Sequence, residues 1–150
     1  MTPDVTSMRV DFHFNVDHRL QYACRVVRKA RSAGKSVLAF ARDPDRIARF
    51  DAALWTFSAL DFLPHVYADS PLAADTPIVL SLQSDSTPQR DVLLNLDDAA
   101  PPGFAQWFGC FERVIEVVSL DADDRRLARL RFNAYREAGI EPTTFKVSGD

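Results

Sequence analysis

The sequence predicts an α/β fold, in which helices flank a mostly parallel sheet in a single three-layer domain. The first third of the chain alternates strand and helix patterns in a β-α-β-α order, which favours a parallel sheet. With 150 residues the chain has the length of one domain that can bury a sizeable core. Hydrophobic residues make up 47% and charged residues 26% of the sequence, as in an ordinary globular protein. Residues 1–7 and 143–150 are expected to be flexible tails.

The first strand and the first helix are expected near the start of the chain. Apolar and polar residues alternate strictly over residues 8–16, so this strand is expected to be buried on one face only. That face carries Val10, Phe12, Phe14 and Val16. Asp17 can cap the following helix and Gly34 can end it. The inner face of the helix carries Leu20, Ala23, Cys24, Val27 and Ala30.

A second strand and a second helix follow directly. The apolar run at residues 36–41 predicts a strand that is buried on both faces. Asp43 then supplies a cap, and Pro44 takes the first helical position. The inner face of this helix carries Ile47, Phe50 and Leu54. Trp55 lies at the edge of that face, where it could belong to the core or to the rim of a peptide-binding pocket.

The second half of the chain is expected to contribute three more strands and a short helix. The strands span residues 76–82, 91–96 and 113–118. The first two are separated by a polar surface loop at residues 83–90. A short aromatic helix that contains Trp107 is expected at residues 104–111.

The last helix has the clearest boundaries in the sequence. Asp121 can cap its first turn, and Gly139 with Pro142 ends it. At ~100° per residue, one apolar stripe should pack on the core. That stripe is expected to contain Leu127, Leu130, Ala134 and Ala138, with Ala128, Phe132 and Tyr135 beside it. Arg131 points into this apolar face, so it must extend to solvent or find an acidic partner.

A row of arginines occupies the opposite side of the same helix. Its members are Arg125, Arg129 and Arg136, with Arg126 and Asn133 beside them and Phe132 at the edge. This row could be a solvated basic face. It could also bind a carboxylate or a phosphate, since guanidinium groups bind such anions through two parallel hydrogen bonds.

The other chemistry-bearing residues give little support for catalysis. The sequence contains no glycine-rich phosphate loop and no nucleophile-elbow motif, so no cofactor is expected. His13 is interpreted as a surface residue, His65 lacks a nearby nucleophile, and no metal site is expected. Cys24 and Cys110 lie in apolar helical patterns, which indicates buried thiols in a reducing cytoplasm. The net charge of −3 argues against nucleic-acid binding as the primary role.

Five short segments occur in a distinctive order and spacing. They are residues 32–38, 50–55, 62–65, 90–96 and 134–139. Through these segments the sequence resembles the chi subunit of bacterial DNA polymerase III over nearly the whole chain. The resemblance implies a Rossmann-like α/β fold and a non-enzymatic accessory role at the clamp loader. It also implies two partners, the psi subunit and the acidic, phenylalanine-ending C-terminal tail of single-stranded DNA-binding protein. A nucleotide-dependent enzyme with unusual motifs is the alternative.

The resemblance further implies which residues bind the tail. Trp55 and Arg129 match the tail-binding tryptophan and arginine of the family, and Arg125 stands where the family has a lysine. Asn133 stands where another lysine is expected, so the site loses one cation there. Arg126 or Arg136 could compensate for that loss, and Phe132 borders the same site.

The second implied surface is the one that faces psi. Phe62 matches a phenylalanine on the psi-facing surface, which psi shares in the family with a helicase partner. Pro64 and His65 complete the same segment. The segment is short and apolar, so it could equally belong to the core.

Overall fold

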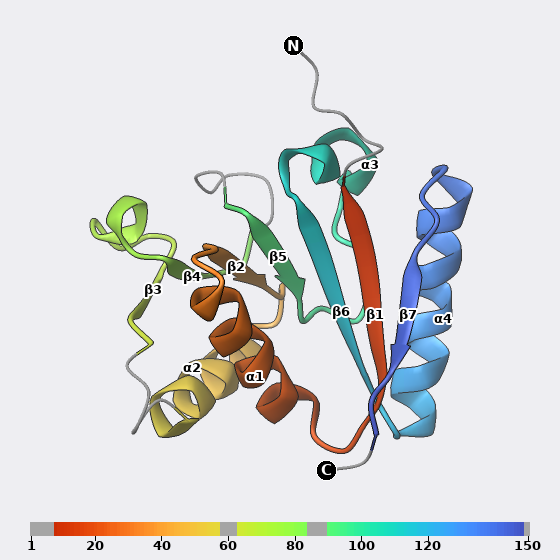
Figure 1. Ribbon diagram of the computed structural model, residues 1–150, viewed down its shortest axis with the longest axis horizontal. Helices are drawn as coiled ribbons and strands as arrows, with labels where there is room; N and C mark the ends of the chain where they lie inside the picture. Colours follow the sequence, from red (N-terminus) through yellow and green to blue (C-terminus); the bar gives the residue numbers. More distant parts are fainter. Residues whose placement is uncertain (1–7, 58–62, 84–89, 149–150) are drawn as a thin grey trace.

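Helices flank both faces of a parallel sheet, as the sequence predicts (Figure 1). The described residues contribute seven strands to this sheet, whereas the sequence predicts five. The computed structural model describes residues 8–57, 63–83 and 90–148. The strands are β1 Arg9–Val16, β2 Val37–Phe40, β3 His65–Tyr67, β4 Ile78–Ser81, β5 Val92–Asn95, β6 Arg113–Ser119 and β7 Thr143–Lys146. The helices are α1 Arg19–Ser32, α2 Pro44–Phe57, η2 Ala73–Asp75, α3 Phe104–Trp107, η3 Phe108–Cys110 and α4 Ala122–Glu137.

The strand order is β3-β4-β2-β5-β6-β1-β7, and every neighbouring pair is parallel. Parallel neighbours require crossover connections, which place helices over the sheet faces. Helices α1 and α2 lie together over one face, whereas α4 packs on the other face against β6 (Figure 1). The described part of the chain contains no helix long and apolar enough to cross a membrane.

Two apolar clusters fill the space between the sheet and the helices. The first lies under α1 and α2, and it includes the predicted inner residues Ile47, Phe50 and Leu54, each fully buried. The second lies under α4 and the aromatic segment, and it includes Phe108 and Tyr135. Strand β2 contributes alternate residues to both clusters, so it is buried on both faces as predicted.

Strand β1 contains a bulge that the alternating sequence pattern does not reveal. Val10 and Phe12 pack in the cluster under α4, as one face of a strand should. Asn15 has a positive φ of 71°, and the pairing with β6 shifts register between His13 and Val16. Val16 therefore packs in the opposite cluster. The prediction that Val16 shares a face with Phe12 was wrong, because an extra residue in the strand reverses the alternation.

The two predicted helix caps near the start of the chain have different outcomes. The carboxylate of Asp43 accepts a hydrogen bond from the Asp45 amide at 3.0 Å, and α2 begins at Pro44 as predicted. The cap of α1 is His18 and not Asp17, and its side chain makes no capping bond. Instead the first helical residue, Arg19, anchors this helix end by binding Asp98.

The C-terminal segment forms a strand and not the expected tail. Residues 143–146 make β7, which pairs with residues 11–14 of β1. Two β-branched threonines and a phenylalanine suit an extended strand. Beyond it the Val147 amide donates to the Phe14 carbonyl, and the Asn15 side chain donates to the Val147 carbonyl. Residues 1–7, the other expected tail, lie outside the described residues.

The aromatic segment at residues 104–111 is helical only in part. It divides into one turn of α-helix and a 3₁₀ turn, which place Phe108 and Phe111 in the core. This break turns Cys110 outward, so the expectation that both cysteines are buried was wrong. Cys24 is buried and free, and burial raises the pKa of its thiol to about 11.

Helix α4 packs on a different stripe from the one expected. Ala128, Arg131 and Tyr135 are buried, whereas Leu130 has an exposed fraction of 58% and Ala138 is exposed. The cause is Glu116, a fully buried carboxylate on β6. A buried charge needs a partner, so the helix turns Arg131 inward at the expense of its apolar residues.

Glu116 is the centre of a polar network inside the α4 layer. Its Oε1 accepts from Arg131 Nε at 2.9 Å, and its Oε2 accepts from the Tyr135 hydroxyl and from Asn95 Nδ2 at 2.8 Å. Arg131 Nη1 also donates to the Asp98 carbonyl at 2.9 Å. Arg131 is thus structural, with the acidic partner that its position required.

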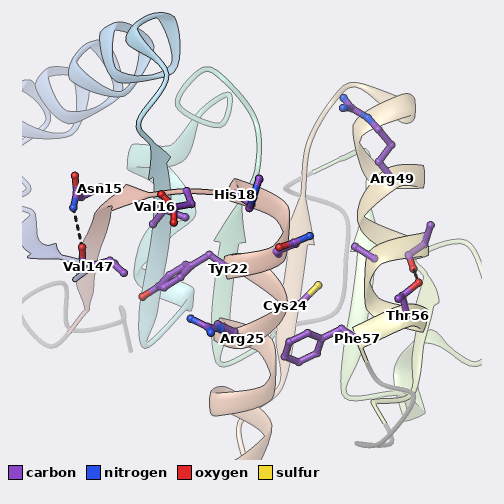
Figure 2. A pocket seen from close by; sticks show the side chains of 14 residues that line it. Asn15, Val16, His18, Tyr22, Cys24, Arg25, Arg49, Thr56, Phe57 and Val147 are labelled. Atoms are coloured by element: carbon purple, nitrogen blue, oxygen red, sulfur yellow. Dashed lines mark hydrogen bonds between the residues drawn. The ribbon is translucent and has the colours of Figure 1, made fainter. Parts of the chain in front are cut away.

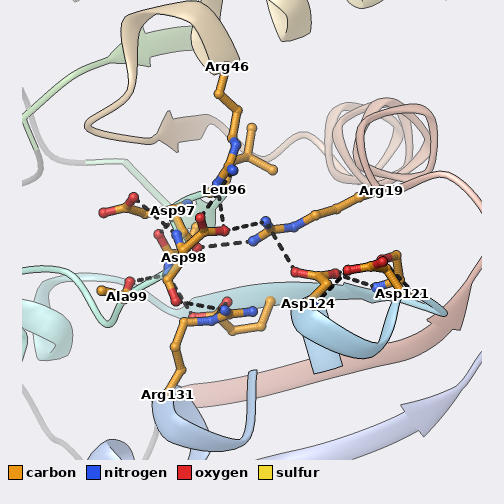
Figure 3. A network of polar contacts seen from close by, with 12 residues as sticks. Arg19, Arg46, Leu96, Asp97, Asp98, Ala99, Asp121, Asp124 and Arg131 are labelled. Carbon is orange, nitrogen blue, oxygen red and sulfur yellow. Dashed lines mark hydrogen bonds and ion pairs between the residues drawn. The ribbon is translucent and has the colours of Figure 1, made fainter. Parts of the chain in front are cut away.

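A second set of ion pairs joins the helices across the ends of the strands, and Figure 3 shows it. We call it the Arg19 cluster; its members are Arg19, Arg42, Arg46, Asp97, Asp98 and Asp124. Arg46 binds both oxygens of Asp98, at 2.8 and 3.2 Å, and Arg19 approaches Asp98 at 3.3 Å and Asp124 at 3.6 Å. The cluster therefore connects α1, α2 and α4 to the loop after β5.

Replacing Arg131 tests the importance of the Glu116 network. Arg131→Met should lower the free energy of unfolding by about 3–5 kcal/mol, because it leaves the Glu116 carboxylate buried without its cation. Urea unfolding followed by circular dichroism measures this loss. Arg126→Met is a matched control on the same helix, where an exposed pair with Asp123 should contribute about 0.5 kcal/mol or less. Equal losses in the two variants would contradict the assignment.

The Arg19 cluster should make stability depend on pH in acid. Hydrogen bonds from Arg46 hold the pKa of Asp98 below its ordinary value of 3.8, although burial opposes them. The stabilisation is therefore complete above pH 3.8 and is lost as pH falls through the folded-state pKa. Asp98→Asn should be less stable than the wild type by on the order of 1 kcal/mol near neutral pH, since Asp98 is half exposed. This difference should shrink below pH 3.8.

Urea unfolding of both proteins between neutral and acid pH measures that difference. Asp45→Asn is the matched control, because Asp45 forms an exposed pair with Arg49 one turn along α2. If the difference in the free energy of unfolding between the wild type and Asp98→Asn grows as the pH falls, its pH dependence is opposite to the one expected. Asp98 would then not belong to the stabilising network.

Candidate functional site

A hollow with a volume of about 350 Å³ lies between α4 and the β1–β7 edge of the sheet. We call it the α4 hollow. Its lining residues are Phe12, Phe14, Asn15, Val118, Ser119, Leu120, Arg125, Ala128, Arg129, Phe132, Thr144 and Lys146. Three sheet strands and one helix therefore contribute to a single concave surface.

The floor of the α4 hollow is apolar and its walls are aromatic. Phe12, Val118 and Ala128 line it from buried positions. The Phe132 ring meets the Phe12 ring edge-on, with a centroid separation of 5.3 Å. Phe14 keeps an exposed fraction of 37% on this side of the sheet, immediately before the bulge at Asn15. The hollow can thus accept one more apolar side chain among rings that are already positioned.

Cations border this apolar surface on two sides. Arg125 and Arg129 lie one turn apart on α4, both exposed, and Lys146 lies on β7. Side chains four residues apart on a helix are neighbours, so both guanidinium groups can approach one anionic ligand. An apolar slot beside two guanidinium groups suits a ligand that carries an apolar side chain next to a carboxylate.

The structure brings together only part of the predicted arginine row. Arg125, Arg129 and Phe132 share the α4 hollow. Among the described residues, neither Asn133 nor Arg136 lines it, and Arg136 instead approaches Glu141 at 3.4 Å. Arg126 pairs with Asp123 on the same helix at 2.7 Å. The row therefore has two flanks: Arg125 and Arg129 lie on the flank that meets the sheet, whereas Arg126 and Arg136 lie on the flank that faces solvent.

Trp55 lies far from the α4 hollow. Its ring packs on His65 of β3 with a centroid separation of 4.4 Å, and its exposed fraction is 55%. Strands β3 and β7 are the opposite edges of the sheet, and α2 and α4 pack in different apolar clusters. Five strand spacings separate β3 from β1, or about 24 Å. The structure therefore does not bring Trp55 and Arg129 together in one pocket.

The predicted psi-facing segment is described only in part. Phe62 lies outside the described residues. Pro64 is half-buried, and His65 is buried, with Nε2 at 2.9 Å from Asp51 Oδ1 and Nδ1 at 2.9 Å from the Leu63 carbonyl. His65 thus supports the packing of Trp55. Among the described residues, Trp55, Tyr67 and Leu72 expose large apolar side chains near this edge.

A second and larger cleft lies between α1 and α2, with a volume of about 610 Å³. Tyr22, Cys24 and Arg25 of α1 face Thr56 and Phe57 of α2 across it (Figure 2). None of its described lining residues is one that the sequence marked for tail or psi binding.

Sequence reasoning missed several residues of the α4 hollow. Thr144 and Lys146 belong to β7, which was expected to be a tail. The run of two threonines and a phenylalanine after Pro142 was the available signal for a strand. Phe14 was expected to be buried in the core; it lies on the same face of β1 as Phe12, but it is partly exposed in the wall of the hollow.

Three comparisons with known proteins agree with this architecture. The family described as DNA polymerase III chi subunit, HolC, matches residues 8–143 of the chain. A protein named DNA polymerase III subunit chi from Pseudomonas aeruginosa is 36% identical over 135 residues, which cover 87% of this chain and 91% of the relative. One of the same name from Escherichia coli K12 is 31% identical over 125 residues, covering 83% of this chain and 82% of the relative.

The crystal structure of T4 UvsW is a more distant likeness. It superposes with a TM-score of 0.69 at 8% identity, covering 95% of this chain and 42% of the other. At that identity the likeness shows the α/β fold alone. The family match and the two relatives, in contrast, extend over most of the sequence. The chain therefore belongs to the DNA polymerase III chi subunit family.

Proposed function

We propose that this chain is a non-enzymatic adaptor of the replisome in the cytoplasm. It binds the acidic C-terminal tail of single-stranded DNA-binding protein and, through a separate surface, the psi subunit. These contacts link the clamp loader to single-stranded DNA that is coated for replication. The observation that supports the proposal best is the apolar α4 hollow beside Arg125 and Arg129.

The chemistry of the α4 hollow suits the end of such a tail. A terminal phenylalanine ring fits an apolar slot bordered by Phe12, Phe14 and Phe132. Its free carboxylate then lies where Arg129 can bind it with two parallel hydrogen bonds. Arg125 and Lys146 are left for acidic residues upstream in the tail. Lys146 also supplies a cation from the opposite wall, which compensates for the uncharged Asn133.

Trp55 is better assigned to the psi-facing surface than to the tail site. It packs on His65, within the segment that the resemblance relates to psi. Trp55, Tyr67 and Leu72 expose apolar surface near the same sheet edge, and such clusters of aromatic and aliphatic residues are typical of protein interfaces. A helicase partner could compete with psi for this edge.

The alternative, a nucleotide-dependent enzyme, has less support. Parallel α/β sheets bind nucleotides beyond the carboxyl ends of their strands. In this chain the Arg19 cluster occupies the ends of β2 and β5, where arginines and aspartates bind one another. No feature of the described residues favours turnover.

A double-mutant cycle tests whether Arg129 binds the terminal carboxylate. Amidating a tail peptide that ends in phenylalanine should weaken binding to the wild type by on the order of 1.5–3 kcal/mol. The same amidation should cost Arg129→Ala much less, which gives a coupling above about 1 kcal/mol. Fluorescence titrations at two salt concentrations measure all four affinities. Arg126→Ala is the matched control, because Arg126 lies on the solvent flank of the same helix. A coupling free energy near zero would mean that the arginines attract the acidic peptide only diffusely and that Arg129 does not bind its terminal carboxylate.

Trp55→Ala separates the two proposed surfaces. The variant should bind the tail peptide with unchanged affinity, because Trp55 lies at the opposite edge of the sheet. It should lose co-purification with psi, since exposed tryptophans are often dominant interface residues. Leu130→Ala, which removes another exposed apolar side chain, is the control for both measurements. If Trp55→Ala instead loses tail binding, Trp55 belongs to the tail site and not to the psi-facing surface.

A further inference from the structure

A strongly cationic surface lies on the other side of β1 from the α4 hollow. It surrounds a shallow cavity of about 600 Å³ and we call it the β1 cationic patch. Its lining residues are Arg9, Asp11, His13, Tyr22, Arg25, Lys29, Arg113, Phe145, Lys146, Val147 and Ser148. Five of these side chains are cationic and one is a carboxylate, although the whole chain has a net charge of −3.

Asp11 holds two of the arginines side by side. Its carboxylate is buried, with an exposed fraction of 2%, and its two oxygens lie 3.3 Å from Arg9 and 3.5 Å from Arg113. Arg9 and Arg113 are also direct partners in the pairing of β1 with β6, so their backbones are one strand spacing apart. One buried carboxylate thus positions two half-exposed guanidinium groups, each of which retains further donors for a ligand.

Helix α1 adds a second row of positive charge. Arg25 and Lys29 are four residues apart, so they project as neighbours from the same face. Burial is the main cause that lowers the pKa of the His13 imidazole; the nearby Asp11 carboxylate opposes this shift, and the charges of Lys29 and Arg113 add to it. A neutral imidazole leaves the aromatic surface of His13 available for packing.

Aromatic rings lie between the two cationic rows. The His13 ring packs against Tyr22 and Phe145, with centroid separations of 5.6 and 5.4 Å. His13 Nδ1 lies 2.6 Å from the Tyr22 hydroxyl, which fixes the orientation of both rings. Phe145 extends this stack outward, with an exposed fraction of 41%. The patch therefore combines a supported, solvent-facing ring with cations on both sides.

We infer that the β1 cationic patch binds single-stranded nucleic acid, as a contact auxiliary to the adaptor role. Sequence-independent binding to single strands has two requirements. One is a set of cations along the phosphate backbone, and the other is an aromatic ring on which a base can stack. An acidic peptide would use the cations but has no need of the exposed Phe145. The patch and the α4 hollow open on opposite faces of β1 and share Lys146 alone among their described lining residues, so both ligands can be held together. The net negative charge of the chain makes this contact weak. Its dependence on cation–phosphate contacts makes it sensitive to salt.

The experiment is a titration of a fluorescein-labelled 20-nucleotide oligothymidylate with the full chain, followed by anisotropy. Binding should be detectable at about 50 mM salt and should weaken steeply toward about 200 mM. Lys29→Glu should weaken binding on the order of tenfold and reduce the salt dependence, because it removes a phosphate contact. Phe145→Ala should weaken binding by a similar factor through lost stacking. Arg126→Glu, with the same charge change on the solvent flank of α4, should have little effect.

Two further measurements make the outcome decisive. Tail-peptide binding by Lys29→Glu should be unchanged, which shows that the variant is folded and that the two sites are separate. Polyglutamate of similar length should compete poorly with the oligonucleotide. Absence of binding at low salt, equal losses for Lys29→Glu and Arg126→Glu, or competition by polyglutamate at the same concentration as unlabelled oligonucleotide would each overturn the inference.

Discussion

The ion pair between Glu116 and Arg131 determines how α4 lies on the sheet, and the candidate site depends on that orientation. Glu116 is buried in β6 and is bound by Arg131, Tyr135 and Asn95. With Arg131 directed inward and ~100° of rotation per residue, Arg125, Arg129 and Phe132 fall on the flank that meets β1 and β7. Were α4 rotated to bury Leu130 instead, this flank would turn away from the sheet. A buried polar interaction thus sets the position of a surface site.

Much of the fold could be predicted because hydrophobic periodicity is a local property. The inner residues of α2, the doubly buried β2 and the starts of α2 and α4 were all correct, since caps and apolar spacing act within a few residues. The errors involve contacts over long separations. The reversal of Val16 depends on a bulge against β6, and β7 forms because β1 provides an edge more than 100 residues earlier in the chain.

The site was predictable on one side only. Helical spacing alone grouped Arg125 with Arg129, and both residues line the α4 hollow. The walls from β1 and β7 could not be found in this way, because no local pattern indicates which strand lies opposite a helix. Trp55 illustrates the same limit. The resemblance to the family matched Trp55 with the tail-binding tryptophan, but the strand order of the sheet determines how far Trp55 lies from Arg129.

The place of β1 in the sheet also affects how the chain folds during synthesis. Its two neighbours, β6 and β7, are made about 100 residues or more after it. At about 5–20 residues per second, a ribosome needs roughly 5–20 s to add the ~100 residues between β1 and β6. Throughout that interval both edges of an aromatic-rich strand lack their native partners, so the nascent chain exposes a segment prone to aggregation.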